Sequence, residues 1–226
     1  MTFSIVGRCA RTGMFGVAIT TSSICVGARC PHARAGVGAV ATQNVTNPDI
    51  APRVLDRLVA GDTADIALGT AMRDEAYPAC RQVTVVDAAG RTAIHTGEHI
   101  LGTNADARGE GSLAAGNLLG SPQVPAAMIE SFAQGDALHL AERLLRALEA
   151  GVAAGGEEGP IHSAALYVVS QTPFPLVDLR VDWADEDAAV PTLRTLWQAY
   201  EPQMQAYLDR ALNPSVAPSY GVPGDR

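Results

Sequence analysis

The sequence predicts an α+β fold, a four-layer αββα sandwich in which two mostly antiparallel sheets lie between pairs of helices. Strand-forming runs occur as neighbouring hairpins, and helical runs occur in consecutive pairs. The chain has 226 residues and an apolar fraction of 47%, which is enough to bury a large core. Because strands and helices do not alternate singly, a doubly wound parallel sheet is disfavoured.

Eight runs predict strands. The first two flank an Arg-Thr-Gly turn signal, and the fourth and fifth flank Ala-Ala-Gly, so each pair reads as a hairpin. The third run is small and apolar throughout, as expected of a strand covered on both faces. The predicted strands are residues 3–6, 13–20, 35–42, 81–87, 91–96, 112–117, 163–169 and 176–181.

Five segments predict helices. The first opens at 47–49, where Asn47 or Asp49 can cap it. Asp62 and Asp136 are the expected caps of the second and fourth helices, and Ser121-Pro122 opens the third. The last helix spans about 187–212, and its aromatic residues at helical spacing predict a core or subunit contact. We therefore expect a single domain over residues 1–212 and a flexible tail over residues 213–226.

Composition limits the classes of partner. The formal charge is −8 and the pI is near 5.0, which disfavours nucleic-acid binding and a polybasic membrane anchor. No run approaches the roughly 20 apolar residues of a membrane helix. The first residues lack the pattern of a signal peptide. We expect a cytoplasmic protein that acts on a small-molecule substrate, with no nucleic-acid or membrane partner.

All sixteen basic residues are arginine. A chain without lysine has no Schiff-base lysine, no pyridoxal-phosphate anchor and no phosphate-loop lysine. Genomic composition bias explains the absence most simply. It still has a chemical consequence, because any cation that this protein uses must be arginine, histidine or the amino terminus.

Thr2 is the first candidate for chemistry. A small second residue permits removal of Met1, which would leave a hydroxyl and a free α-amine on one residue. The α-amine has a reference pKa of about 7.7–8.0 and can take the hydroxyl proton near neutral pH. A strand that begins at once would hold such a nucleophile rigidly. The Met-Thr dipeptide alone is weak evidence, since many chains begin this way by accident.

Polar side chains at strand ends supply the remaining candidates. Amides and hydroxyls after the third strand would form an oxyanion hole or bind a polar substrate, although helix capping and turn formation are the plain alternatives. The predicted catalytic residues are Thr2, Thr21, Arg34, Gln43 and Asn44, and the predicted substrate-binding residues are Thr46, His95 and Asn117.

We expect no metal and no cofactor. His95 and His99 have the spacing of a HExxH motif, but Gly97 interrupts it and the segment leaves a strand instead of forming a helix. Four cysteines without a CxxC pair are expected to be small buried residues. The glycines at 109 and 111 do not join a strand to a helix as a phosphate loop does.

Several segments resemble a family of bacterial and archaeal proteins. They are TFSIVGR (2–8), TGMFGVAI (12–19), ARAGVGAVATQNVTNP (33–48), RQVTVVDAAG (81–90), HTG (95–97), AAGNLL (114–119), AERLLRALEAGVAAGG (141–156) and VDLRVD (177–182). In this order they look like the DUF1028 family of the N-terminal-nucleophile (Ntn) hydrolase-like superfamily. The resemblance implies that fold, a small-amide hydrolase of amino-acid or nitrogen catabolism, and a homo-oligomer.

Proteasome-type β subunits of the same superfamily offer a further comparison. Thr2 matches the threonine that begins their first strand. Those subunits place a lysine near the nucleophile, whereas the nearest cation here is Arg34, which can bind a carboxylate but cannot cycle protons. They also place an acidic residue where this chain has Thr20 and Thr21. Both departures argue against a proteasome-like proton transfer.

Three hypotheses remain open. In the first, Thr2 attacks a linear amide of a small, carboxylated substrate, its α-amine is the base, Gln43 or Asn44 stabilises the oxyanion, and Arg34 binds the carboxylate. In the second, the protein binds a ligand or assembles without catalysis. In the third, an internal hydroxyl such as that of Thr21 attacks, with His95 nearby.

Overall fold

The computed structural model describes residues 1–222, and these contain ten strands and five α-helices. The strands are β1 (Thr2–Arg8), β2 (Phe15–Thr21), β3 (Pro31–Arg34), β4 (Gly38–Asn44), β5 (Arg81–Asp87), β6 (Thr92–Thr96), β7 (Ala105–Gly109), β8 (Ser112–Asn117), β9 (Ser163–Val169) and β10 (Val177–Val181). The helices are α1 (Ile50–Val59), α2 (Ala64–Arg73), α3 (Val124–Gln134), α4 (Leu140–Ala153) and α5 (Ala189–Leu212).

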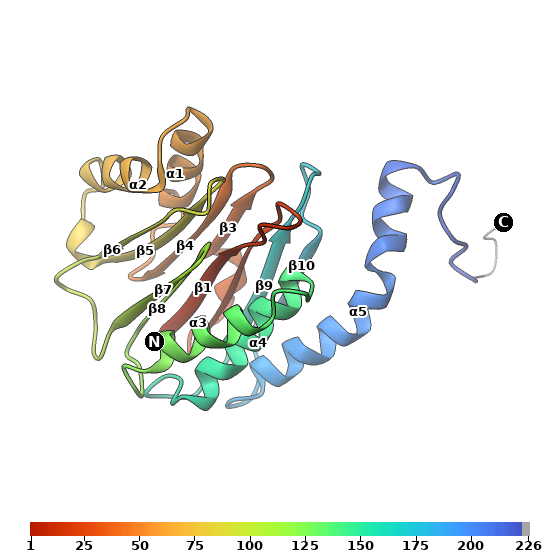
Figure 1. The fold of residues 1–226 in the computed structure, drawn as a ribbon. Coiled ribbons are helices and arrows are strands. Elements are labelled where there is room, and N and C mark those ends of the chain that lie inside the picture. Colours follow the sequence, from red (N-terminus) through yellow and green to blue (C-terminus); the bar gives the residue numbers. More distant parts are fainter. Residues whose placement is uncertain (223–226) are drawn as a thin grey trace.

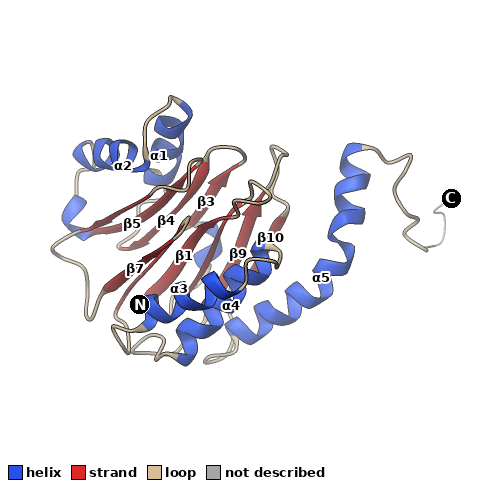
Figure 2. Cartoon of the chain, viewed as in Figure 1, coloured by secondary structure: helices blue, strands red, loops and turns tan. Residues whose placement is uncertain are grey.

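The strands form two antiparallel sheets, which confirms the predicted α+β class (Figures 1 and 2). The larger sheet has the order β10-β9-β2-β1-β8-β7, and the smaller has the order β3-β4-β5-β6. Helices α1 and α2 pack on the smaller sheet, whereas α3 and α4 pack on the larger one, with α5 against β9 and β10. Contacts of β1 with β4 and β5 bring the sheets face to face.

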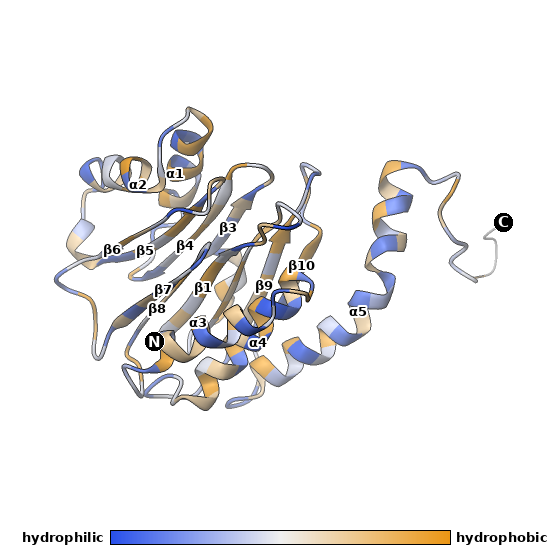
Figure 3. Ribbon diagram, in the orientation of Figure 1, coloured by the Kyte–Doolittle hydropathy of each residue, from blue (hydrophilic) through white to orange (hydrophobic). Residues whose placement is uncertain are grey.

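The first strand is buried on both faces. Phe3 and Ile5 join the core between the larger sheet and its helices, which includes Leu144. Val6, on the opposite face, joins the core between the two sheets. This alternation follows from the period of two in a β-strand, and it points Thr2 and Ser4 toward the smaller sheet. Figure 3 shows the resulting pattern, with largely hydrophobic strands and helices of mixed character.

The predicted start of the third strand is wrong. Residues 35–37 form a turn between β3 and β4, with Gly36 in the left-handed region at φ +71 and a hydrogen bond from Val37 N to Arg34 O. The small apolar run at 35–42 therefore combines a turn with a strand. The sequence also gave no signal for β7, an edge strand whose residues alternate between half-buried and exposed.

Two predicted helix caps are also wrong. Thr63, rather than Asp62, caps α2 by accepting a hydrogen bond from Ile66 N. His139, rather than Asp136, caps α4 by accepting from Ala141 N. The two aspartates lie just outside these helices and pair with arginines instead.

Helix α5 packs on the sandwich through its first half. Trp197 is buried and donates to Glu142 of α4, whereas Tyr207 further along the helix is exposed. The later part of the helix leads away from the sheets (Figure 1). The predicted tail has neither helix nor strand over residues 213–222, and its last four residues lie outside the described range. In the part of the chain that the structure describes, no helix has both the length and the apolar character needed to cross a membrane.

Candidate active site

The β1–β2 hairpin places two hydroxyls side by side. Thr2 lies opposite Thr21 in the register of the hairpin, and on its other side it lies opposite Asn117 of β8. The Oγ1 atoms of Thr2 and Thr21 are 3.0 Å apart, and both residues are buried. The sequence-predicted candidates Thr2, Thr21 and Asn117 are therefore brought together at one end of the larger sheet.

Met1 occupies the space next to these hydroxyls. Its carbonyl oxygen accepts hydrogen bonds from Thr2 Oγ1, at 2.6 Å, and from Thr21 Oγ1. Its side chain lies against Gly159, where an added Cβ would come within 2.5 Å of the methionine Cε. With Met1 in place, the nitrogen of Thr2 belongs to a peptide bond and is not a base. Removal of Met1 would free both the Thr2 nitrogen and the two hydroxyls.

A cavity of about 250 Å³, here called the Thr2 cavity, opens beside the two threonines. Its lining is rich in hydroxyls and amides and contains one arginine and no carboxylate. The lining residues are Thr2, Thr21, Ser23, Val26, Arg29, Cys30, Gln43, Asn44, Thr46 and Pro48.

Buried polar side chains connect the two sheets beneath this cavity. Gln43 Oε1 accepts from Ser4 Oγ at 2.7 Å, and Gln43 Nε2 donates to Gln82 Oε1, also at 2.7 Å. Asn117 Nδ2 donates to the same Gln82 oxygen at 3.1 Å, while Asn117 Oδ1 is buried without a partner. An amide nitrogen carries two protons, and the bond to Gln82 uses one of those on Gln43. Gln43 therefore keeps a donor available.

Two further predicted residues, Asn44 and Thr46, line the cavity and differ in their hydrogen bonds. The side chain of Asn44 is held at both ends, because Nδ2 donates to Cys80 O at 2.9 Å and Oδ1 accepts from Leu101 N at 3.3 Å, and these bonds leave one Nδ2 proton unused. Asn44 also adopts a left-handed backbone, with φ +70. Thr46 Oγ1 donates to Thr42 Oγ1 at 3.2 Å and can still accept a bond. These bonds fix Asn44 in the loop structure, and both Asn44 and Thr46 keep capacity to contact a ligand.

Arg34 and His95 lie elsewhere. Arg34 lies at the far end of β3, where it is exposed and pairs with Asp56 at 2.9 Å. His95 of β6 lies opposite Val83 of β5, on the face of the smaller sheet that packs against α1 and α2. Its Nε2 forms a hydrogen bond with Pro78 O at 2.8 Å. Neither residue contributes to the lining of the Thr2 cavity. The arginine that does so is Arg29.

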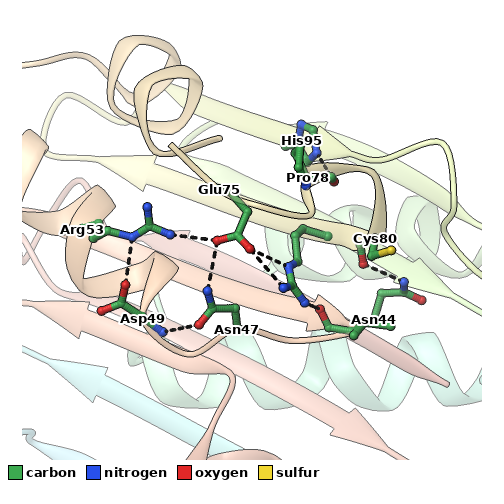
Figure 4. Close-up of polar contacts among 10 residues, drawn as sticks. Asn44, Asn47, Asp49, Arg53, Glu75, Pro78, Cys80 and His95 are labelled. Carbon is green, nitrogen blue, oxygen red and sulfur yellow. Dashed lines mark hydrogen bonds and ion pairs between the residues drawn. The ribbon is translucent and has the colours of Figure 1, made fainter. Parts of the chain in front are cut away.

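The loop that carries Asn44 and Thr46 is held by a buried ion-pair cluster (Figure 4). Glu75 Oε2 accepts from Asn47 Nδ2 at 3.0 Å and from Arg53 at 2.9 Å. Glu75 Oε1 accepts from Arg81 at 3.0 Å, and a second nitrogen of Arg81 donates to Val45 O. Asn47 or Asp49 is the predicted cap of α1; Asp49 occupies the cap position without a side-chain cap bond, and Asn47 Oδ1 accepts from Asp49 N in the turn before the helix. The cluster fixes residues 45–47 against β5.

Stability should depend on pH through this cluster. Burial alone would raise the pKa of Glu75, but hydrogen bonds from Arg81, Asn47 and Arg53 outweigh it and hold this pKa below the ordinary value of 4.5. The unfolded chain then binds the proton first as the pH falls, so the stabilisation is present above pH 4.5 and is lost below it.

We expect the urea midpoint of the wild type to fall on acidification from about pH 6 to about pH 4. The Glu75→Gln variant should show a smaller fall. Some fall should remain in the variant, because the pKa values of Asp87 and Glu142 are also lowered. Equal pH dependence in the two proteins would contradict this role of Glu75.

Sequence reasoning missed four residues of the site: Ser4, Arg29, Gln82 and Glu157. Ser4 and Gln82 carried a signal, because each is a polar residue that alternates with apolar ones in a buried strand. Arg29 and Glu157 lie in connections between the named strands and helices. Only the tertiary fold brings them to the start of β1.

A family model described as "Family of unknown function (DUF1028)" matches residues 2–191. Among solved structures, protein SPO2555 from Silicibacter pomeroyi, described with the same family model, is 30% identical, with a TM-score of 0.81 over 88% of this chain and 85% of that chain. No curated protein matches the chain.

Two structures of Anbu are similar at a lower level. Anbu (ancestral beta-subunit) from Yersinia bercovieri is 12% identical, with a TM-score of 0.35 over 90% of this chain and 96% of that chain. The Anbu (Gly-1) mutant from Hyphomicrobium sp. strain MC1 is 14% identical, with a TM-score of 0.38 over 91% and 97%. Similarities of this size carry no argument about function.

Proposed function

This chain belongs to the DUF1028 family, and we propose that it is an Ntn-type amidohydrolase that cleaves a linear amide bond of a small, carboxylated metabolite. The observation that carries the proposal is the position of Thr2. Its hydroxyl lies at the first residue of a rigid central strand, beside a polar cavity. Residues of this type at this position suit an amino-terminal nucleophile.

The reaction begins after removal of Met1. The Thr2 α-amine, in its neutral form, takes the proton of the Thr2 hydroxyl while Oγ1 attacks the amide carbon. The resulting ammonium gives this proton to the leaving nitrogen as the C–N bond breaks. Water then hydrolyses the ester, releasing a carboxylic acid and restoring the threonine.

The remaining cavity residues have separate roles in this proposal. Gln43, which keeps an N–H available, stabilises the oxyanion. Thr21 holds the nucleophile, since its hydroxyl lies 3.0 Å from that of Thr2. Thr46, which also lines the cavity, contacts the polar part of the substrate.

Arg29 is the reason for proposing that the substrate carries a carboxylate. Its Nη1 donates to Ile24 O at 2.7 Å, and within residues 1–222 its guanidinium forms no ion pair. A guanidinium without a carboxylate partner, at the edge of a cavity that also lacks carboxylates, favours an anionic ligand. Arg29 takes the role that the sequence suggested for Arg34.

An Arg29→Met variant should bind carboxylated amides less well. We expect KM to rise about 10- to 100-fold, as for the loss of a charged hydrogen bond, with a smaller change in kcat. Arg34→Met should leave KM unchanged, because Arg34 pairs with Asp56 on the surface. Steady-state kinetics on carboxylated amides and their neutral analogues would measure both effects. A larger effect from Arg34→Met would contradict the assignment.

The mass of the intact protein tests the first requirement of the proposal. We expect a chain that begins at Thr2. A chain that retains Met1 and hydrolyses amides would exclude Thr2 as the nucleophile. A chain that retains Met1 and has no activity would instead favour a non-catalytic ligand-binding protein, in which Met1 covers the threonines. The third hypothesis loses its base, since His95 lies on the other face of the smaller sheet.

A further inference from the structure

Glu157 is a buried carboxylate beside the start of β1. It lies in the glycine-rich connection after α4, where Gly155 and Gly156 adopt positive φ values of +127 and +55. Leu119 forms an isolated bridge with Glu157, and Glu158 N donates to Leu118 O at 2.9 Å. These bonds fix the connection against the end of β8, the strand that pairs with β1.

The carboxylate of Glu157 is only partly satisfied. Its Oε2 accepts from Ser22 N at 3.0 Å, next to Thr21. Its Oε1 is buried and has no hydrogen-bond partner, and the residue is 9% exposed. Within the described residues, no arginine or histidine pairs with Glu157. A buried carboxylate in this state is costly unless a cation completes it.

The chain's own amino group is the candidate for that cation. Met1 packs against Gly159, two residues after Glu157, so the start of the chain lies along this connection. Burial raises the pKa of Glu157 to about 7, with Asp187 adding to the rise, while the chain's amino group and Ser22 N–H oppose it. Two charged groups, the amino group and Asp187, thus act on this carboxylate.

We propose that Glu157 binds the α-amino group of Thr2 in the chain that lacks Met1, and holds it next to the Thr2 hydroxyl. The inference rests on the proposed function, which requires this amine as the base. Glu157 is a positioning residue, because it acts on the amine and not on the substrate. The free Oε1 accepts an N–H of the amine in either protonation state. The carboxylate favours the ammonium, and in the neutral fraction of the amine the nitrogen lone pair can take the hydroxyl proton.

The absence of lysine makes a direct test possible. The α-amine is the only primary amine of the chain, so an N-acetyl group located on the amino-terminal peptide reports on this group alone, apart from any acetylation of cysteine or tyrosine. Acetic anhydride would be applied over a range of pH to protein that begins at Thr2, and the acetylated fraction would be measured by mass spectrometry. The midpoint of labelling gives the apparent pKa of the amine, and any coupling to Glu157 appears in that midpoint.

The informative variant is Glu157→Gln. Gln retains an oxygen that can accept from Ser22 N, so the loop should keep its structure. Loss of the negative charge should lower the labelling midpoint by about 1–3 pH units, the usual effect of an opposite charge within a few ångströms. Glu158→Gln is the matched control, since this exposed neighbour has the same charge. Its midpoint should equal that of the wild type.

Each outcome decides the proposal. A lower midpoint in Glu157→Gln alone supports it. Equal midpoints in all three proteins, with unchanged thermal unfolding, would overturn it, and so would a chain from which Met1 cannot be removed. The labelling does not depend on hydrolysis. If Thr2→Ala removes activity while the midpoints are equal, the role of Glu157 is rejected and Thr2 remains the nucleophile. If the midpoint falls in Glu157→Gln but the wild type hydrolyses no amide, Glu157 binds the amine and the proposed hydrolysis is rejected.

Discussion

Thr2→Ala should abolish amide hydrolysis and leave the fold intact. The variant removes the hydroxyl that forms the ester in the proposed reaction, and loss of a nucleophile reduces kcat by roughly 10⁴-fold or more. The backbone of residue 2 still pairs with Thr21 and Asn117 in the sheet. In the chain that begins at Thr2, the side-chain hydrogen bond lost is the one between the Oγ1 atoms of Thr2 and Thr21. Hydrolysis of a panel of small carboxylated amides would measure the effect.

Two features make Thr2→Ala a clean comparison. Alanine is also a small second residue, so removal of Met1 should proceed as in the wild type, and intact mass would verify this. Thr2→Ser retains a hydroxyl and an α-amine and should recover a substantial part of the activity. A Thr2→Ala protein with wild-type activity would reject the nucleophile. Loss of folding in circular dichroism would contradict the expectation of an intact fold, and activity recovered in Thr2→Ser would then carry the test.

Arg81→Met should destabilise the protein by about 3 kcal/mol, since it leaves the buried carboxylate of Glu75 with less compensation. The side chains of Arg81 and Glu75 are 10% and 4% exposed, so water replaces little of the lost interaction. Arg53 and Asn47 still bond to Glu75, which places the effect at the lower end for a broken buried pair. Urea unfolding at neutral pH would measure the change.

Arg53→Met is the matched comparison for Arg81→Met. Arg53 also pairs with Glu75, but its side chain is 30% exposed and it shares its charge with Asp49. We expect a smaller loss of stability from this variant. Arg81→Met should in addition lower hydrolysis, because Arg81 binds Val45 O in the loop that brings Thr46 to the cavity. Equal losses of stability in the two variants would contradict the importance of burial at Arg81.

Local patterns were sufficient for much of the fold. Strands β5, β8 and β9 have the predicted bounds, because turn residues or a change in polarity mark their ends. The predicted strand at 35–42 begins too early because Gly36 turns the chain inside a run of small apolar residues, and β3, which precedes this turn, was missed. β7 was missed because its sequence, ADARG, has no β-branched or aromatic residue.

The candidate site was predicted less completely, for reasons of strand geometry. The predicted hairpin implies that one hydroxyl of residues 20–23 faces the start of the first strand, and the observed register places Thr21 there. Gln43 and Asn44 are neighbours in β4, so their side chains point to opposite faces, and composition does not tell which face meets the other sheet. The position of Glu157 depends on packing between α4, β8 and β1, which no local pattern encodes.

Trapping of the acyl-enzyme tests the proposed nucleophile most directly. A small carboxylated β-lactone opens on attack by the nucleophile and leaves it acylated, and peptide mass spectrometry then locates the added mass. We predict a single adduct on the residue-2 hydroxyl of a chain that begins at Thr2, and none in Thr2→Ala. An adduct on Thr21, or on any other side chain while Thr2 stays unmodified, would contradict the proposed mechanism.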